Sequence, residues 1–111
     1  MNLAVTPGEG AKKKRAPLSE KEKIQALLKH VEKSGLIFVR NGTEHPAPKA
    51  REHMEYKLSR AGNRVQTARQ FIDMIATKSY LSGEYYYVKY PDGKMVRTCD
   101  FLNRKLAQLE K

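Results

Sequence analysis

Five polar side chains between residues 40 and 57 have the types and spacing to bind an anion. Arg40 and Asn41 end an apolar run, His45 follows in the next segment, and His53 and Lys57 lie four residues apart. Residues four apart share one face of a helix, so His53 and Lys57 are expected to point the same way. Arg40 can hold a carboxylate or phosphate through two parallel hydrogen bonds. This cluster predicts a binding site for an anionic ligand or a partner protein.

The same residues have a structural interpretation, which the sequence leaves open. Arg40 and Asn41 would then stabilise a turn, and His53 would hydrogen-bond a backbone carbonyl that holds the neighbouring loop. Unfolding of the domain by Arg40→Ala and His53→Ala would favour this second interpretation.

Metal binding and catalysis are the other functions that histidine, serine and cysteine residues could serve. His45 and His53 with a nearby glutamate lack the ligand spacing of a metal site, and the surrounding lysines and arginines oppose a metal ion. No serine has the flanking glycines of a hydrolase nucleophile. The single cysteine, Cys99, fits a structural residue. We expect no metal, no cofactor and no catalytic residue, and we favour a non-enzymatic protein.

Length and composition limit the architecture. The chain has 111 residues, of which 40% are apolar and 31% charged, as in an ordinary soluble domain. The longest apolar run, Leu36 to Val39, is far shorter than the roughly 18 residues of a membrane span. We expect a single small domain over residues 19–111, preceded by a flexible basic tail at residues 1–18.

The charge suggests an alternative partner. The formal net charge is +10, and Lys12-Lys13-Lys14-Arg15 form a basic run within the tail. A nucleic-acid-binding protein would use this run together with exposed tyrosines on which bases stack. Over the rest of the chain the cations are interspersed with anions, so the pattern favours a solvated surface over a basic stripe.

The helices are indicated by capping motifs and apolar spacing. Ser19 to Glu22 and Thr67 to Gln70 are capping boxes, and each is followed by apolar residues at helical spacing. A second helix begins near Pro48 and ends at Gly62, and a last one contains Phe101 to Leu109.

The strands are indicated by β-branched and aromatic residues. Leu36 to Val39 predict a buried strand that ends at the Asn41-Gly42 turn, with His45 in a loop. Tyr85 to Tyr90 and Met95 to Thr98 predict a hairpin. The fold class is therefore α+β, with about four helices packed on a short, mostly antiparallel sheet. A winged helix-turn-helix is the alternative, with the hairpin as its wing.

The tyrosine strand offers one more candidate. Alternation places Tyr85 and Tyr87 on one face and Tyr86, Val88 and Tyr90 on the other. One set should enter the core and the other should remain exposed. We include Tyr86 among the candidate binding residues.

Four of these segments together resemble the YfeK-like family, a bacterial family of small proteins of unknown function. They are the strand ending in Arg40-Asn41-Gly42, the Ala50-x-x-His53 helix with Lys57, the Thr67-Ala68-x-x-Phe71-Ile72 helix, and the Ser79 to Gly83 loop followed by Tyr86. The resemblance covers residues 20–110. It implies an exported, periplasmic protein, whose partner would be an envelope protein or an anionic small molecule. Residues 1–10 do not show the pattern of a signal peptide, so a cytoplasmic location is the alternative.

Overall fold

The structure is a computed structural model that describes residues 17–111, so the basic run at residues 12–15 lies outside the described residues. The elements in chain order are α1 (Glu20–Lys33), β1 (Ile37–Arg40), β2 (Thr43–Pro46), α2 (Ala47–Ala61), the 3₁₀ helix η2 (Gly62–Arg64), α3 (Ala68–Ile75), β3 (Tyr87–Lys89), β4 (Met95–Arg97) and α4 (Thr98–Leu109). The expected α+β class is confirmed.

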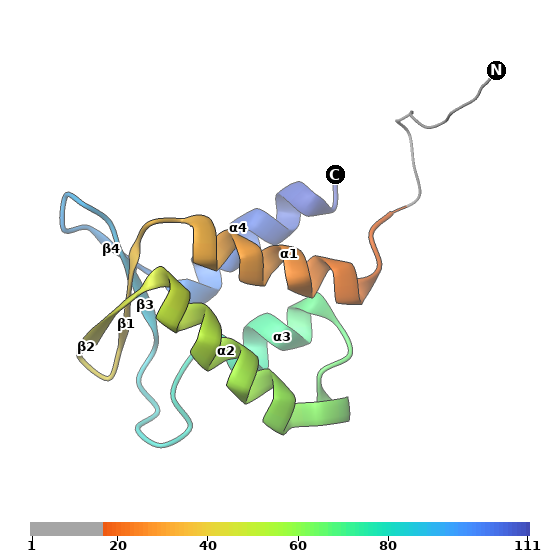
Figure 1. The fold of residues 1–111 in the computed structure, drawn as a ribbon, viewed down its shortest axis with the longest axis horizontal. Coiled ribbons are helices and arrows are strands. Elements are labelled where there is room, and N and C mark those ends of the chain that lie inside the picture. The colour runs from red at the N-terminus through yellow and green to blue at the C-terminus, as the bar shows by residue number, and fades with distance from the viewer. Residues whose placement is uncertain (1–16) are drawn as a thin grey trace.

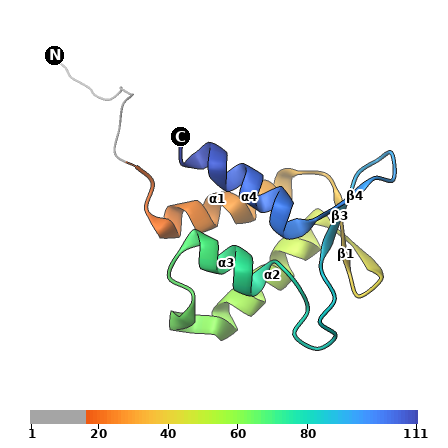
Figure 2. The ribbon, with the colours of Figure 1, turned by 180° about the vertical axis from the view of Figure 1, so that it is seen from behind.

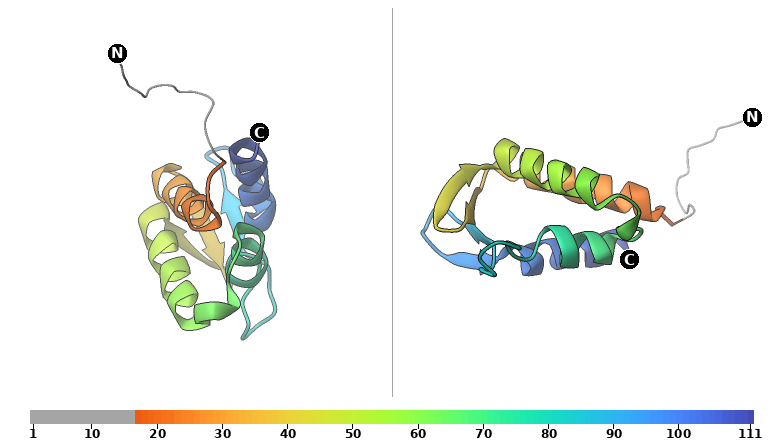
Figure 3. Two further views of the ribbon diagram at one scale, coloured as in Figure 1. Left: turned by 90° about the vertical axis from the view of Figure 1, so that its right-hand side faces the viewer. Right: turned by 90° about the horizontal axis from the view of Figure 1, so that it is seen from below.

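The helices form two layers, and the sheet closes one end of the molecule. Helix α1 lies beside α2 in one layer, and α3 lies beside α4 in the other (Figures 1 and 3). Seen from behind, α3 and α4 extend from the sheet toward the end where α1 begins (Figure 2). This arrangement places the start of α2 and the start of α4 against the sheet.

The predicted capping boxes begin the two helices that start away from the sheet. The Ser19 hydroxyl accepts a hydrogen bond from the Glu22 amide, and the Thr67 hydroxyl accepts one from the Gln70 amide. In each case the side-chain oxygen of the residue three positions on accepts a hydrogen bond from the cap amide, which satisfies a second free donor. Both predicted helix starts are therefore confirmed.

One apolar core lies between the two helix layers. Helix α2 contributes the smaller buried residues Ala47, Ala50 and Ala61 together with Met54. The largest fully buried side chains come from α1, α3, α4 and β3: Phe71, Leu27, Leu28, Ile72, Ile75, Leu102, Leu106, Val31 and Val88. These are the positions that the helical spacing of apolar residues marks in the sequence. Removing this surface from water is the main driving force for the fold.

The sheet has four antiparallel strands in the order β2-β1-β3-β4. The early strand β1 pairs with β2 on one side and with β3 of the C-terminal hairpin on the other. Val39 lies opposite Tyr87, and Tyr87 lies opposite Arg97. The predicted strand and the predicted hairpin are thus parts of one sheet.

The structure corrects the expected loop at His45. Residues Thr43 to Pro46 form strand β2, which pairs with β1 so that His45 lies opposite Phe38. Asn41 and Gly42 both have positive φ, 51° and 77°, as required by a two-residue hairpin turn. The turn signal was in the sequence, but the polar segment after it shows none of the apolar alternation that indicates a strand.

The C-terminal hairpin is shorter than predicted. Strand β3 spans Tyr87–Lys89 and β4 spans Met95–Arg97, and Thr98 is the first residue of α4. The predicted alternation is confirmed, since Tyr86 and Val88 are buried at 7% and 0% exposure. Tyr85 forms only an isolated bridge with Lys78.

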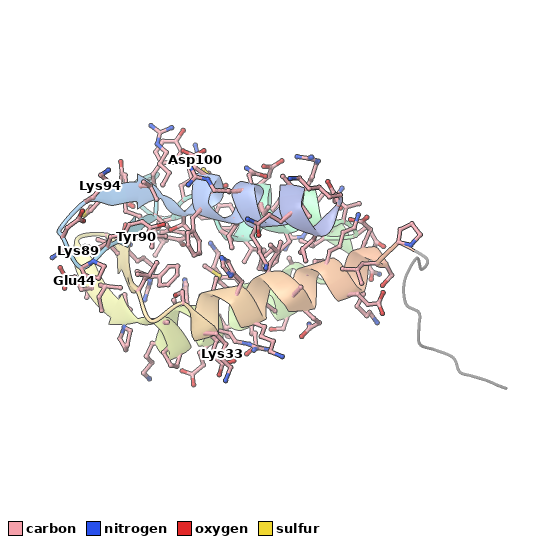
Figure 4. The ribbon with its side chains drawn as sticks, turned by 90° about the horizontal axis from the view of Figure 1, so that it is seen from above. Lys33, Glu44, Lys89, Tyr90, Lys94 and Asp100 are labelled. Atoms are coloured by element: carbon pink, nitrogen blue, oxygen red, sulfur yellow. The ribbon has the colours of Figure 1, made fainter. Side chains whose placement is uncertain are left out.

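The two faces of the sheet have different surroundings. The face with Phe38 and Val88 turns toward the helices, and we call it the inner face. On the opposite face, Lys89 Nζ lies 2.7 Å from a Glu44 carboxylate oxygen, a pair that spans β1 at the end of the molecule (Figure 4). The apolar inner face is the one that can form a sheltered binding site.

Among the helices of residues 17–111, none is long and apolar enough to cross a membrane.

Candidate functional site

A pocket of about 520 Å³ lies between the inner face of the sheet and the first turns of α2. Phe38 and Val39 of β1 and Ala50 and Met54 of α2 supply its apolar lining. The polar part of the lining is Arg40, His45, Lys49, Glu52, His53, Tyr56, Tyr86 and Thr98. The volume falls within the roughly 300–1,000 Å³ of small-molecule sites.

One cross-strand row forms the inner side of this pocket. Continuing the observed register by one residue places Arg40, the last residue of β1, beside Tyr86 and Thr98, which directly precede β3 and directly follow β4. The Thr98 amide donates a 2.9 Å hydrogen bond to the Tyr86 carbonyl, which fixes this part of the row. At the usual strand spacing, Arg40 and Thr98 are separated by about 10 Å at their Cα atoms.

The charges around the pocket do not cancel. Lys49 Nζ lies 3.5 Å from a Glu52 carboxylate oxygen, so these two side chains offset each other. Arg40, which is half-buried, has no ion pair within residues 17–111. The pocket therefore has one cation without a matching anion.

Two helix starts add positive potential to the same place. Lys49 and Ala50 belong to the first turn of α2, and Thr98 begins α4. Neither helix has a side-chain cap, in contrast to α1 and α3. The free amides at a helix start favour a negative charge nearby.

His53 approaches the row from α2. Its ring meets the Tyr86 ring edge to face, with centroids 6.4 Å apart. Burial, together with the charges of Arg40, Lys57 and His45, lowers the pKa of His53 to about 4. The imidazole is therefore neutral at pH 7 and provides one N–H donor and one acceptor.

Lys57 does not line the pocket but contacts Tyr86, which does. Its Nζ donates hydrogen bonds of 2.9 Å to the Tyr86 hydroxyl and to the Ile75 carbonyl, and it lies over the rings of Tyr80 and Tyr86. Burial, with a smaller contribution from Arg40, lowers the pKa of Lys57 to about 8. Burial also raises the pKa of the Tyr86 phenol. Lys57 thus orients Tyr86 and does not itself line the pocket.

Asn41 is separated from the other candidates. Its side-chain oxygen accepts a hydrogen bond from the Ser82 hydroxyl, which joins the β1–β2 turn to the loop before β3. The structure therefore brings Arg40, His45, His53 and Tyr86 together around the pocket. Lys57 lies outside the lining and contacts it through Tyr86, and Asn41 lies in the β1–β2 turn.

Two buried polar atoms at the pocket have no hydrogen-bond partner within residues 17–111. They are His45 Nε2 and Thr98 Oγ1. Thr98 is fully buried, at 0% exposure. Buried polar groups are hydrogen-bonded in the great majority of cases, so two unpartnered atoms on one pocket mark it as a place where a ligand can bind.

Sequence reasoning overlooked Thr98 and the apolar side of the site. The sequence predicts Thr98 as the last residue of a strand, and pairing it with Tyr86 across the predicted hairpin places both residues on one face. Phe38, Ala50 and Met54 resemble ordinary core residues in sequence, and only the structure shows that they also line a pocket.

The tyrosines provide little free stacking surface on the strand itself. Tyr86 is buried, and the Arg97 guanidinium lies 3.8 Å from the centre of the Tyr85 ring. The strongly exposed tyrosines are Tyr56 and Tyr80, which lie outside the sheet. Within the described part of the chain, no three histidine, cysteine or acidic side chains are grouped to hold a metal ion.

Comparisons with known proteins show what the chain is similar to. Residues 18–110 match the family described as "Family of unknown function (DUF5329)". Over 68 residues the chain is 41% identical to "Uncharacterized protein YfeK" of Salmonella typhimurium (strain LT2). This alignment covers 60% of the chain and 57% of the relative's length. No solved structure matches the chain.

Proposed function

Because the chain belongs to the DUF5329 family of unknown function, we propose its function from the pocket: it is a non-enzymatic domain that binds a small organic anion between α2 and the inner face of the sheet. Membership confirms the YfeK-like resemblance, and the family description assigns no activity. The observation that carries the proposal is Arg40, which lines an apolar pocket and has no ion pair with any of the described residues 17–111.

Three features of the pocket support an anion with an apolar body. Arg40 can hold an anionic group through two parallel hydrogen bonds. The starts of α2 and α4 add a favourable potential for negative charge. Phe38 and Met54 offer an apolar surface that a fully hydrated inorganic ion would not use.

The proposal is tested with two probes that differ only in charge. 2-Naphthoate is a flat carboxylate, and 2-naphthamide is its uncharged counterpart. We expect calorimetric titration of the full chain to show binding of the carboxylate and much weaker binding of the amide. Arg40→Gln should weaken carboxylate binding about tenfold or more.

Arg104→Gln is the matched control, because it removes the same charge from an exposed position of α4. It should leave the Kd within about twofold, since exposed charges are screened by salt. Equal effects of the two substitutions, or equal binding of acid and amide, would contradict the proposal. Preferential binding of a single-stranded DNA oligonucleotide, weakening steeply with salt, would favour the nucleic-acid alternative instead.

Export is part of this proposal and rests on the family resemblance. In an exported protein the pocket would meet envelope components, and an envelope protein is a further candidate partner. Fractionation of the source cells, with mass spectrometry of the mature N-terminus, tests the location. Recovery from the cytoplasm with Met1 intact would contradict it.

A further inference from the structure

The strongest unexplained feature of the pocket is the Thr98 hydroxyl. Thr98 is fully buried, lines the pocket and has an oxygen atom without a partner within residues 17–111. A threonine inside a helix can donate to a carbonyl of the preceding turn. As the first residue of α4, Thr98 has no preceding turn, so its hydroxyl remains free for another partner.

His45 is the second residue with an unused polar atom. It lies on β2 next to β1, diagonally across from Arg40, because Phe38 pairs with His45 and Arg40 with Thr43. Diagonal neighbours in a sheet are within reach of long side chains. His45 Nε2 and the Arg40 guanidinium can therefore approach the same anionic group from two strands.

The two ends of the cross-strand row thus offer different chemistry. At β1 and β2 there is a cation with an adjacent imidazole, and at the start of α4 there is a neutral hydroxyl. Tyr86 lies between them, and Phe38, Ala50 and Met54 supply the apolar surface of the pocket. A ligand that spans this distance of about 10 Å needs an apolar body with a polar group at each end.

The charge at the first end favours a carboxylate over a phosphate. Lys49 and Glu52 offset each other, and Arg40 is the remaining strong cation of the lining. His53 contributes no charge at pH 7, because burial and neighbouring cations lower its pKa. A single positive charge matches a monoanion, whereas a phosphate monoester would bring nearly two negative charges.

We propose that the pocket selects a carboxylate whose apolar body carries a hydroxyl at its far end, with Arg40 and His45 on the carboxylate and Thr98 on the hydroxyl. This inference rests on the proposed function, since it specifies the ligand class of the same site. It adds a role for the buried Thr98 hydroxyl, which has no hydrogen-bond partner within residues 17–111.

The test compares probes with and without a hydroxyl, on proteins with and without the hydroxyl of Thr98. The probes are 2-naphthoate and 6-hydroxy-2-naphthoate, which differ by a hydroxyl at the end away from the carboxylate. In the wild-type chain we expect the hydroxylated probe to bind about five- to tenfold more tightly, as one neutral hydrogen bond allows. Thr98→Val keeps the side-chain shape, and it should abolish this preference, so that the two probes bind the variant with similar Kd values.

Thr98→Ser keeps the hydroxyl and should retain the preference, which separates hydrogen bonding from packing. Chemical denaturation of the variants shows that each is folded. If both probes bind wild type equally and Arg40→Gln weakens both, the anion pocket stands and the hydroxyl selection is wrong. If neither probe binds, the proposed function fails, and this inference fails with it.

Discussion

At the scale of single residues, the half-buried His53 shows how burial at the pocket disfavours the protonated form of an imidazole. It faces Arg40, Lys57 and His45, and burial is the largest cause of its lowered pKa of about 4. In the unfolded chain an imidazole titrates near its ordinary pKa of 6.5. Between these two values the unfolded state binds a proton that the folded state does not bind, so the free energy of unfolding should fall as the pH falls.

We therefore expect a loss on the order of 1 kcal/mol from His53 between pH 6.5 and pH 4, because solvent screens a half-exposed site. Above pH 6.5 the effect of His53 should vanish. Urea denaturation of wild type and His53→Gln over this range isolates it as the difference between the two curves. His30, whose pKa is also lowered by burial and by Lys105, remains in both proteins. Parallel curves would show that His53 titrates alike when folded and unfolded.

At the scale of elements, the β1–β2 hairpin aligns Arg40 with His45. Gly42 has a φ of 77°, and an added Cβ would meet no atom within 4 Å. Gly42→Ala should thus cost only backbone strain, about 1–2 kcal/mol of unfolding free energy. We also expect weaker 2-naphthoate binding, because a distorted turn shifts both side chains. Calorimetry and denaturation measure the two effects.

Gly62→Ala is the matched control for the turn. Gly62 also has positive φ and an open Cβ position, but it ends α2 at the end away from the pocket. It should lower stability at least as much and leave the Kd of 2-naphthoate unchanged. If both variants weaken binding equally, the loss reflects overall stability and not the position of Arg40 and His45.

How well the sequence predicted each element depended on how local its signal was. The capping boxes at Ser19 and Thr67 lie within four residues, and both predicted helix starts agree with the structure. Alternation likewise placed Tyr86 and Val88 on one face, and the structure shows that this face is the buried one. Strand β2 was not predicted, because its residues are polar and only their pairing with β1 places them in the sheet. The place of Thr98 in the pocket was not predicted either. It depends on tertiary burial where the sheet meets α2, and no local sequence pattern encodes that.

At the scale of the whole molecule, the polar contacts that join α1 to α3 and α4 lie at the opposite end from the candidate site. Away from the sheet, a Glu20 carboxylate oxygen accepts a 2.9 Å hydrogen bond from the Ala68 amide, which ties α1 to the start of α3. Lys23 Nζ lies 3.0 Å from carboxylate oxygens of both Glu20 and Glu110, which adds the end of α4. At the sheet end, α2 and α4 begin without side-chain caps and face the pocket.

This separation predicts that Glu20→Ala lowers stability without changing binding. The variant leaves the Ala68 amide without its acceptor and removes one partner of Lys23, so the urea midpoint should fall. The pKa of Glu20 is lowered by the Ala68 hydrogen bond and by Lys23. Its contribution is therefore present above about pH 4.5 and lost as the pH falls below it, so wild type and variant should converge in acid.

The Kd of 2-naphthoate at pH 7 should stay within about twofold of wild type, because the site and these contacts share no residues. A larger change in Kd would show that the helix layers couple the two ends, and the pocket could then no longer be treated as a rigid site formed by the sheet and the starts of α2 and α4 alone.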